Sequence, residues 1–169
     1  MLKKSLIAAV IVFITSINVY SQKEKVQSAF IYNFITKYFE WPAAYKSGDF
    51  YLGVLGNSPI IDEFNTLASS RKVGNQKISV KKFNTASEIT LCHVLYICGS
   101  KIDELESALG KVGSTLVITD SEIGSNTKGV AINFKTVEKK QKFELKAYNA
   151  TMRGLIISPD LGQMLLSSN

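Results

Sequence analysis

The chain contains a single histidine, His93, which directly follows Cys92. An imidazole beside a thiol could serve a hydrolase or ligate zinc. Zinc requires three or four convergent ligands, however, and neighbouring residues on a strand point to opposite faces of the sheet. No serine–histidine–aspartate constellation lies near His93 in the sequence. We therefore expect no metal, no cofactor and no catalytic residue, and we interpret His93 as a structural residue; a hydrolase that uses it is the alternative.

The second cysteine, Cys98, lies six residues after Cys92. The segment Leu91–Cys98 is almost continuously apolar and is typical of one buried strand. Along such a strand the two cysteines would be roughly 20 Å apart, whereas a disulfide joins Cα atoms that lie about 4.4–6.8 Å apart. A Cys92–Cys98 disulfide is therefore not expected. The two thiols are interpreted as buried, and an intermolecular bridge through an exposed Cys98 beside Gly99 is the alternative.

Residues that could bind an anion gather at one predicted turn. Gly56, Asn57 and Ser58 join a buried strand to the start of a helix, where free backbone N–H groups can hold a phosphate. Asp120 follows a later strand, at the place where α/β folds bind their ligands. The turn is neither a Walker loop nor a full dinucleotide fingerprint. Ordinary turn and helix-cap roles are the alternative for all four residues.

Four aromatic residues surround one proline at the end of the first predicted helix. Exposed aromatic clusters often anchor a protein partner, but they also close the edge of a core. Both interpretations stay open for this cluster, which consists of Tyr38, Phe39, Trp41, Pro42 and Tyr45. No pair of carboxylates lies in a hydrophobic context, so a glycosidase site is not indicated.

The hydrophobic pattern alternates between helices and short apolar strands, which is typical of an α/β fold. We predict one domain with a central mixed sheet, mostly parallel, with a C-terminal antiparallel hairpin and flanking helices. Two predicted helices cover residues 23–39 and 147–153. Three more are predicted: one opened by Ser58 and Pro59, one capped by Ser100 and stopped by Gly113, and a short one after Pro159. Its predicted strands are 50–55, 77–83, 91–97, 115–119, 130–134 and 142–145.

The first 21 residues resemble a signal peptide. Lys3 and Lys4 precede an apolar run from Leu6 to Val19, and small residues lead to a cleavage site after Ser21. The run is shorter than the roughly 20 residues of a membrane span. We therefore expect a signal peptide over 1–21, one domain over 22–169 and a periplasmic location. An uncleaved anchor is the alternative, and a lipid anchor is not expected because no cysteine lies near the cut.

Charge and composition favour a folded protein that does not bind nucleic acid. Apolar residues make up 46% and charged residues 20% of the chain, which argues against disorder. The formal net charge of +6 falls to +4 when Lys3 and Lys4 leave with the signal peptide. The cationic excess is nearly all lysine, because Arg71 and Arg153 are the only arginines. Nucleic-acid readers more often combine arginines with aromatic residues, so a solvated basic surface is favoured.

Several segments, in order along the chain, resemble the YfiR-like family of exported bacterial proteins. The opening signature and the first strand with its turn are similar over Ala29–Phe34, Lys37–Pro42 and Leu52–Pro59. The later strands and the closing segment are similar over Leu91–Ile97, Thr115–Asp120, Phe143–Leu145 and Gly154–Ser158. The resemblance covers essentially the whole predicted mature chain.

This resemblance implies a sheet flanked by helices and no catalysis. Relatives are periplasmic repressors that bind the periplasmic domain of an inner-membrane diguanylate cyclase. An outer-membrane lipoprotein can sequester them, they can form homodimers, and disulfides tune some of them. This chain departs from the family in having both cysteines on one predicted strand and Lys146 where the family usually has an asparagine.

Two functions follow from these observations as hypotheses. The first is a non-enzymatic regulator that binds an inner-membrane signalling protein, either a cyclase or a sensor kinase, with the aromatic cluster as its contact surface. The alternative is a periplasmic sensor module that holds an anionic or aromatic ligand between the turn at Gly56–Ser58 and Asp120.

Overall fold

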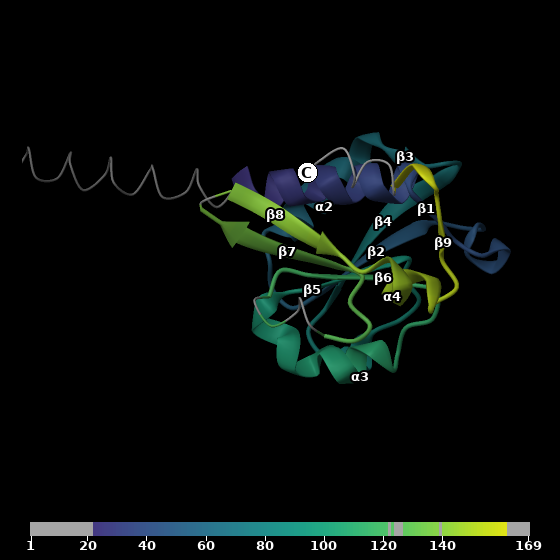
Figure 1. Ribbon diagram of the computed structural model, residues 1–169. Coiled ribbons are helices and arrows are strands. Elements are labelled where there is room, and N and C mark those ends of the chain that lie inside the picture. Colours follow the sequence, from purple (N-terminus) through teal and green to yellow (C-terminus); the bar gives the residue numbers. More distant parts are fainter. Residues whose placement is uncertain (1–21, 122, 124–126, 139, 162–169) are drawn as a thin grey trace, which may run out of the picture.

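The computed structural model describes residues 22–121, 123, 127–138 and 140–161. The predicted signal peptide therefore lies outside the described residues, as do the last residues of the predicted C-terminal helix. Within these ranges the chain forms an α/β fold with one large sheet between two layers of helices (Figure 1). This arrangement confirms the fold class predicted from the hydrophobic pattern.

The large sheet has seven strands in the order β3-β4-β2-β5-β6-β7-β8. Strands β4, β2, β5, β6 and β7 run parallel, and β3 and β8 are antiparallel strands at the two margins. The three central strands are almost wholly buried because helices cover both of their faces. The strands are β2 (Phe50–Leu55), β3 (Lys72–Val73), β4 (Gln76–Phe83), β5 (Val94–Ile97), β6 (Leu116–Thr119), β7 (Ile132–Val137) and β8 (Lys140–Leu145).

Two hydrophobic clusters hold the helices against the sheet. A helix over residues 22–37 and α2 (Ile60–Ser70) cover one face, where Phe34 and Phe64 are buried. The other face carries the 3-10 helix η3 (Gly99–Glu104) and α3 (Leu105–Leu109), which bury Leu105 and Ala108. Figure 1 shows these two layers above and below the sheet. A short helix, α4 (Ala147–Thr151), follows the hairpin.

The structure corrects several predicted boundaries. The first helix ends at residue 37, because the chain continues as β1 (Phe39–Glu40) and pairs with β9 (Ile156–Ile157). The sequence pattern did not reveal this small antiparallel sheet. Strand β5 begins only at Val94, and Leu91 is 53% exposed, so the segment 91–98 is not one continuous strand.

The segment after β5 also differs from the prediction. It is a 3-10 helix with non-helical backbone angles at Lys101, followed by only five residues of α-helix. The N-cap of the 3-10 helix is Cys98, so Ser100 lies inside it, and the α-helix ends at Leu109, before the predicted stop at Gly113. The predicted C-terminal hairpin is confirmed, and its strands are longer than predicted.

Candidate functional site

His93 lies at the amino end of β5 and is 1% exposed. The backbone N–H of Tyr51 donates a hydrogen bond to Nδ1 over 3.0 Å, so that nitrogen is unprotonated. Nε2 lies 2.7 Å from the carbonyl oxygen of Tyr45 and therefore carries the proton. Both ring nitrogens thus bind backbone groups, which is the arrangement of a structural imidazole.

Burial lowers the pKa of His93 below its ordinary value, and nearby Lys81 lowers it further. The hydrogen bond to the Tyr45 carbonyl acts in the opposite direction. A second proton on Nδ1 would face the N–H of Tyr51, so the geometry also favours the neutral ring. His93 therefore stays neutral at pH 7, with neither nitrogen free to act as a base.

The aromatic cluster surrounds this histidine. Trp41, which is 5% exposed, donates its indole N–H to the carbonyl oxygen of His93 over 3.1 Å. Phe50 stacks on the imidazole with ring centres 4.3 Å apart. Phe39 is also buried, so it and Trp41 lie in the core rather than at the surface. The members that remain half-buried are Tyr38, Pro42 and Tyr45.

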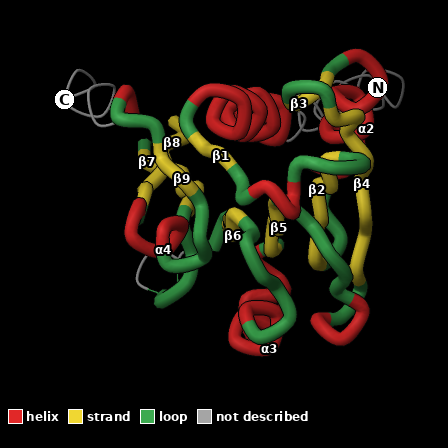
Figure 2. The backbone as a smooth tube through the Cα atoms, turned by 90° about the vertical axis from the view of Figure 1, so that its right-hand side faces the viewer, coloured by secondary structure: helices red, strands yellow, loops and turns green. Residues whose placement is uncertain are grey.

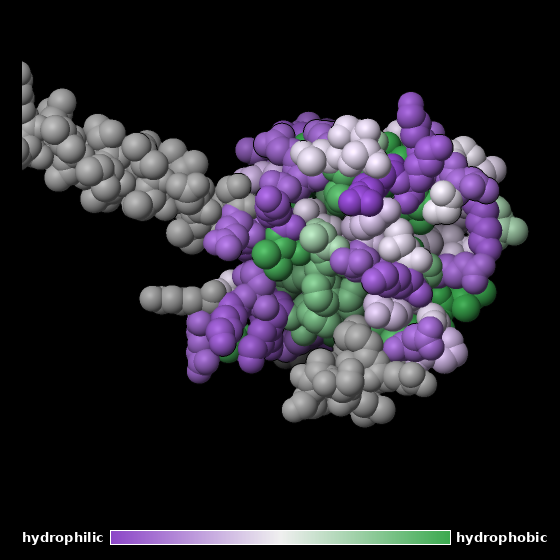
Figure 3. Space-filling view, turned by 90° about the horizontal axis from the view of Figure 1, so that it is seen from above, coloured by the Kyte–Doolittle hydropathy of each residue, from purple (hydrophilic) through white to green (hydrophobic). Residues whose placement is uncertain are grey.

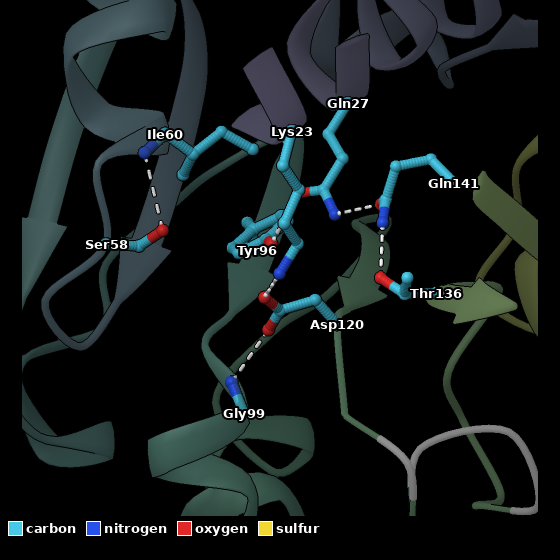
Figure 4. A network of polar contacts seen from close by, with 9 residues as sticks. All are labelled: Lys23, Gln27, Ser58, Ile60, Tyr96, Gly99, Asp120, Thr136 and Gln141. Atoms are coloured by element: carbon cyan, nitrogen blue, oxygen red, sulfur yellow. Dashed lines mark hydrogen bonds and ion pairs between the residues drawn. The ribbon is translucent and has the colours of Figure 1, made fainter. Parts of the chain in front are cut away.

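Asp120 lies at the carboxyl end of β6 and faces the first turn of the helix 22–37. Its carboxylate accepts hydrogen bonds from the backbone N–H of Gly99 over 2.8 Å and from Nζ of Lys23 over 3.1 Å. Figure 4 shows this group beside a second set of polar contacts from the same helix. The carboxylate that was a candidate for ligand binding therefore connects two segments of the chain.

The second set of contacts runs through a buried glutamine. Gln27 is fully buried, and its carbonyl oxygen accepts a hydrogen bond from the Tyr96 hydroxyl over 2.9 Å. Its amide nitrogen donates to Gln141 of β8 over 2.8 Å (Figure 4). Burial raises the pKa of Tyr96, and the neighbouring charge of Asp120 raises it further. The phenol is therefore a neutral hydrogen-bond donor.

The predicted anion-binding turn lies at the same end of the sheet. Gly56 has φ +100°, a conformation that favours glycine, and a Cβ there would lie 2.8 Å from Cγ of Lys101. The N–H of Gly56 donates to the carbonyl of Phe83, and Asn57 accepts a hydrogen bond from Lys82. Ser58 accepts one from the N–H of Ile60 over 3.3 Å. The chain itself therefore engages polar groups of all three turn residues.

The two cysteines lie at opposite ends of β5 and belong to opposite hydrophobic clusters. Both are free and buried, and Cys98 is only 4% exposed. Burial raises the pKa of Cys92 to about 12 and that of Cys98 to about 11. The alternative of an exposed Cys98 is therefore wrong, and neither thiol has the exposure or the acidity of a reactive one.

A surface cavity of about 960 Å³ lies between η3, α3 and α4. Three large apolar side chains at its border, Ile123, Tyr148 and Met152, are between 66% and 69% exposed. Polar groups of Asn149 and Arg153 also line it. The sequence prediction missed this cavity, although Tyr148 and Met152 are spaced four residues apart and so share one side of the helical segment. We call it the α3–α4 cavity.

The face of the molecule above the first helix is mainly hydrophilic (Figure 3). Seen from above the first helix, hydrophilic side chains cover much of the molecule and border a smaller apolar area (Figure 3).

Among the described residues, no group of three or more His, Cys, Asp or Glu side chains could hold a metal ion. Nor does the described part of the chain contain a helix long and apolar enough to cross a membrane.

Comparison with known proteins identifies the family of this chain. No curated protein matches the chain. The model of one protein family, described as YfiR/HmsC-like, matches residues 24–164. The matched range contains nearly all of the described structure, including both ends of β5 and the α3–α4 cavity. This chain therefore belongs to the YfiR/HmsC-like family.

Proposed function

We propose that this protein is an exported, non-enzymatic regulator that binds the periplasmic part of an inner-membrane signalling protein and modulates its output. The partner would carry a diguanylate cyclase or a sensor kinase domain, and an outer-membrane lipoprotein would be a second partner. The observation that carries the proposal is the family match over residues 24–164. The signal-like first 21 residues support export.

The buried polar residues also support a role without catalysis. The one histidine donates to and accepts from backbone groups, and Asp120 binds a lysine and a backbone N–H. An acid–base catalyst needs a titratable group within reach of a substrate. Of the aromatic cluster, the half-buried Tyr38, Pro42 and Tyr45 remain the members that a partner could contact.

The test is crosslinking of the tagged protein in the cell envelope, followed by mass spectrometry of the captured proteins. Recovery of an inner-membrane protein with a cyclase or kinase domain would support the proposal. Capture of no such protein, together with turnover of a substrate by the purified chain, would overturn it.

The α3–α4 cavity favours a second candidate function, a sensor that binds a small aromatic ligand. Its volume of about 960 Å³ is in the range of ligand pockets, and Tyr148 offers an exposed ring for stacking. It is a better place for a ligand than the turn at Gly56–Ser58, whose polar groups are engaged within the chain. Thermal stabilisation by aromatic metabolites that is lost in Tyr148→Ala would support this function, and identical melting curves would exclude it.

A further inference from the structure

Strand β4 has one edge that is largely unpaired. It pairs with β2 over Ile78–Phe83, but on its other side β3 reaches only Gln76 and Lys77. No other described strand pairs with that side of β4. Figure 2 shows β4 at the right-hand margin of the sheet, with nothing of the described chain beyond it. A free strand edge is a template for pairing with another chain.

The hydrogen bonds of β4 show which backbone groups are free. The carbonyl of Phe83 accepts from the N–H of Gly56 and therefore points towards β2. Backbone groups alternate in direction along a strand, so Ile78, Val80 and Lys82 point away from β2. The pairing of Gln76 with β3 on the outer side agrees with this alternation. The antiparallel pairing of Lys72 with Lys77 places the N–H of Ile78 opposite the carbonyl of Arg71, so Val80 and Lys82 are the two residues that present both N–H and C=O groups to an added strand.

The same edge carries a concentration of positive charge. Between Glu63 and Glu88 the chain has five cationic side chains and no acidic one. None of the five forms an ion pair among the described residues, whose four ion pairs all lie elsewhere. The five residues are Arg71, Lys72, Lys77, Lys81 and Lys82, and all but the half-buried Lys81 are exposed.

The charges decide between the two kinds of strand that could pair here. A second copy would place lysines of one β4 opposite those of the other, and like charges across a strand pair are destabilising. An acidic strand would place carboxylates opposite the same lysines. The other margin of the sheet is less uniformly basic, because β8 carries Glu144 as well as Lys140 and Lys142.

We infer that the open edge of β4 binds an extended, acidic segment of the membrane partner by adding it to the sheet as a further strand. The inference deepens the proposed function and rests on it only for the identity of the partner. Backbone groups of Val80 and Lys82 would provide the affinity, and the lysines would select acidic sequences.

The direct test uses the purified protein and a short synthetic peptide of alternating glutamate and valine. We expect binding that weakens with added salt, and slower amide exchange at Val80 and Lys82 when the peptide is present. A peptide with lysine in place of glutamate is the control and should not bind. Unchanged exchange at these two amides would overturn the inference and leave the lysines as protection against unwanted strand pairing.

Two variants separate the backbone contribution from the charge. Val80→Pro removes one outward N–H but none that faces β2, so it should abolish peptide binding while the sheet stays folded, whereas Val80→Thr should bind normally. The double variant Lys77→Glu/Lys82→Glu should weaken binding by about tenfold. Its matched control, Lys140→Glu/Lys142→Glu, makes the same charge change on β8 and should have no effect. Equal binding by all four variants would contradict the inference.

The same variants distinguish this inference from the proposed function in cells. If the wild-type protein captures a membrane signalling protein and Val80→Pro captures it equally well, the function stands and the β4 edge is excluded. If the wild-type protein captures no such partner, the proposed function fails, and the peptide experiment still decides what the edge binds.

Discussion

The two ends of strand β5 are closed by different kinds of interaction. At the amino end, His93 binds two backbone groups and is enclosed by the rings of Trp41 and Phe50. At the carboxyl end, Tyr96 and Asp120 bind side chains of the helix 22–37. The amino end is therefore stabilised mainly by aromatic packing, and the carboxyl end by polar contacts between segments far apart in the sequence.

This difference has a consequence for stability and motion. Aromatic burial contributes several kcal/mol per side chain, whereas a partly exposed ion pair contributes about 1 kcal/mol or less. We therefore expect the amino end to open only when the whole domain unfolds. The carboxyl end should open more readily, together with the start of the first helix.

The largest effect is expected from Trp41→Ala. This change removes a buried indole that contacts Phe50 and His93, so it should lower the free energy of unfolding by about 3–5 kcal/mol. Urea denaturation followed by circular dichroism measures the change. Tyr148→Ala removes an exposed ring and is the control, expected within about 0.5 kcal/mol of wild type. Equal losses of unfolding free energy in both variants would contradict the conclusion that aromatic packing stabilises the amino end.

A smaller effect is expected from Tyr96→Phe at the other end. It leaves the fully buried carbonyl oxygen of Gln27 without its donor, which should cost about 1–3 kcal/mol. The double variant Tyr96→Phe/Gln27→Leu removes both polar partners and should be more stable than the two single losses added together. Strict additivity in the double-mutant cycle would show that the two groups do not interact.

The pH dependence of stability should report on the amino end. The pKa of His93 is lowered in the folded state, so below the ordinary value of about 6.5 the unfolded chain takes up a proton that the folded chain does not. The contribution of His93 is therefore complete above that pH. It falls on acidification by up to about 1.4 kcal/mol per pH unit, until the lowered pKa is reached.

The titration can be observed without a mutation. His93 is the only histidine, so nuclear magnetic resonance shows one imidazole and gives its pKa directly. A midpoint at or above the ordinary histidine value would contradict the buried neutral ring. A midpoint well below it would agree with a neutral His93 ring that stays buried at the amino end of β5.

The fold could be predicted from the sequence further than the roles of individual residues. Long apolar runs such as Leu52–Leu55 predict buried parallel strands because both faces must be covered. Short elements escaped prediction: β1 and β9 have two residues each, and only their pairing across the chain defines them. The length of β5 was overestimated because Cys92 and His93 are buried without being in the strand.

The roles of the candidate residues depended on contacts that no local pattern contains. Asp120 was correctly assigned to the carboxyl edge of the sheet, but its partner Lys23 lies 97 residues away in the chain. The aromatic cluster was predicted as a group, and only the structure shows that Trp41 faces inward to the His93 carbonyl. The free edge of β4 could not be recognised before the strand order was known.

The smallest effect, and the sharpest test of the difference between the two ends, comes from cysteine labelling. Cys92 lies at the amino end and Cys98 at the carboxyl end, and each is studied alone after the other is replaced by alanine. Both thiols should react slowly with an alkylating reagent, because burial raises their pKa values to about 12 and about 11. Lys23→Ala removes the ion pair with Asp120, which is worth about 0.2–1 kcal/mol.

Loss of that ion pair should raise the labelling rate of Cys98 by up to about fivefold, because labelling follows the population of the open form. The rate at Cys92 should not change, since its end is closed by aromatic contacts that Lys23 does not make. Lys25→Ala, on the same helix and exposed, is the matched control. An equal acceleration at both cysteines would mean that the two ends open together as one unit. The polar contacts at the carboxyl end would then have no separate role.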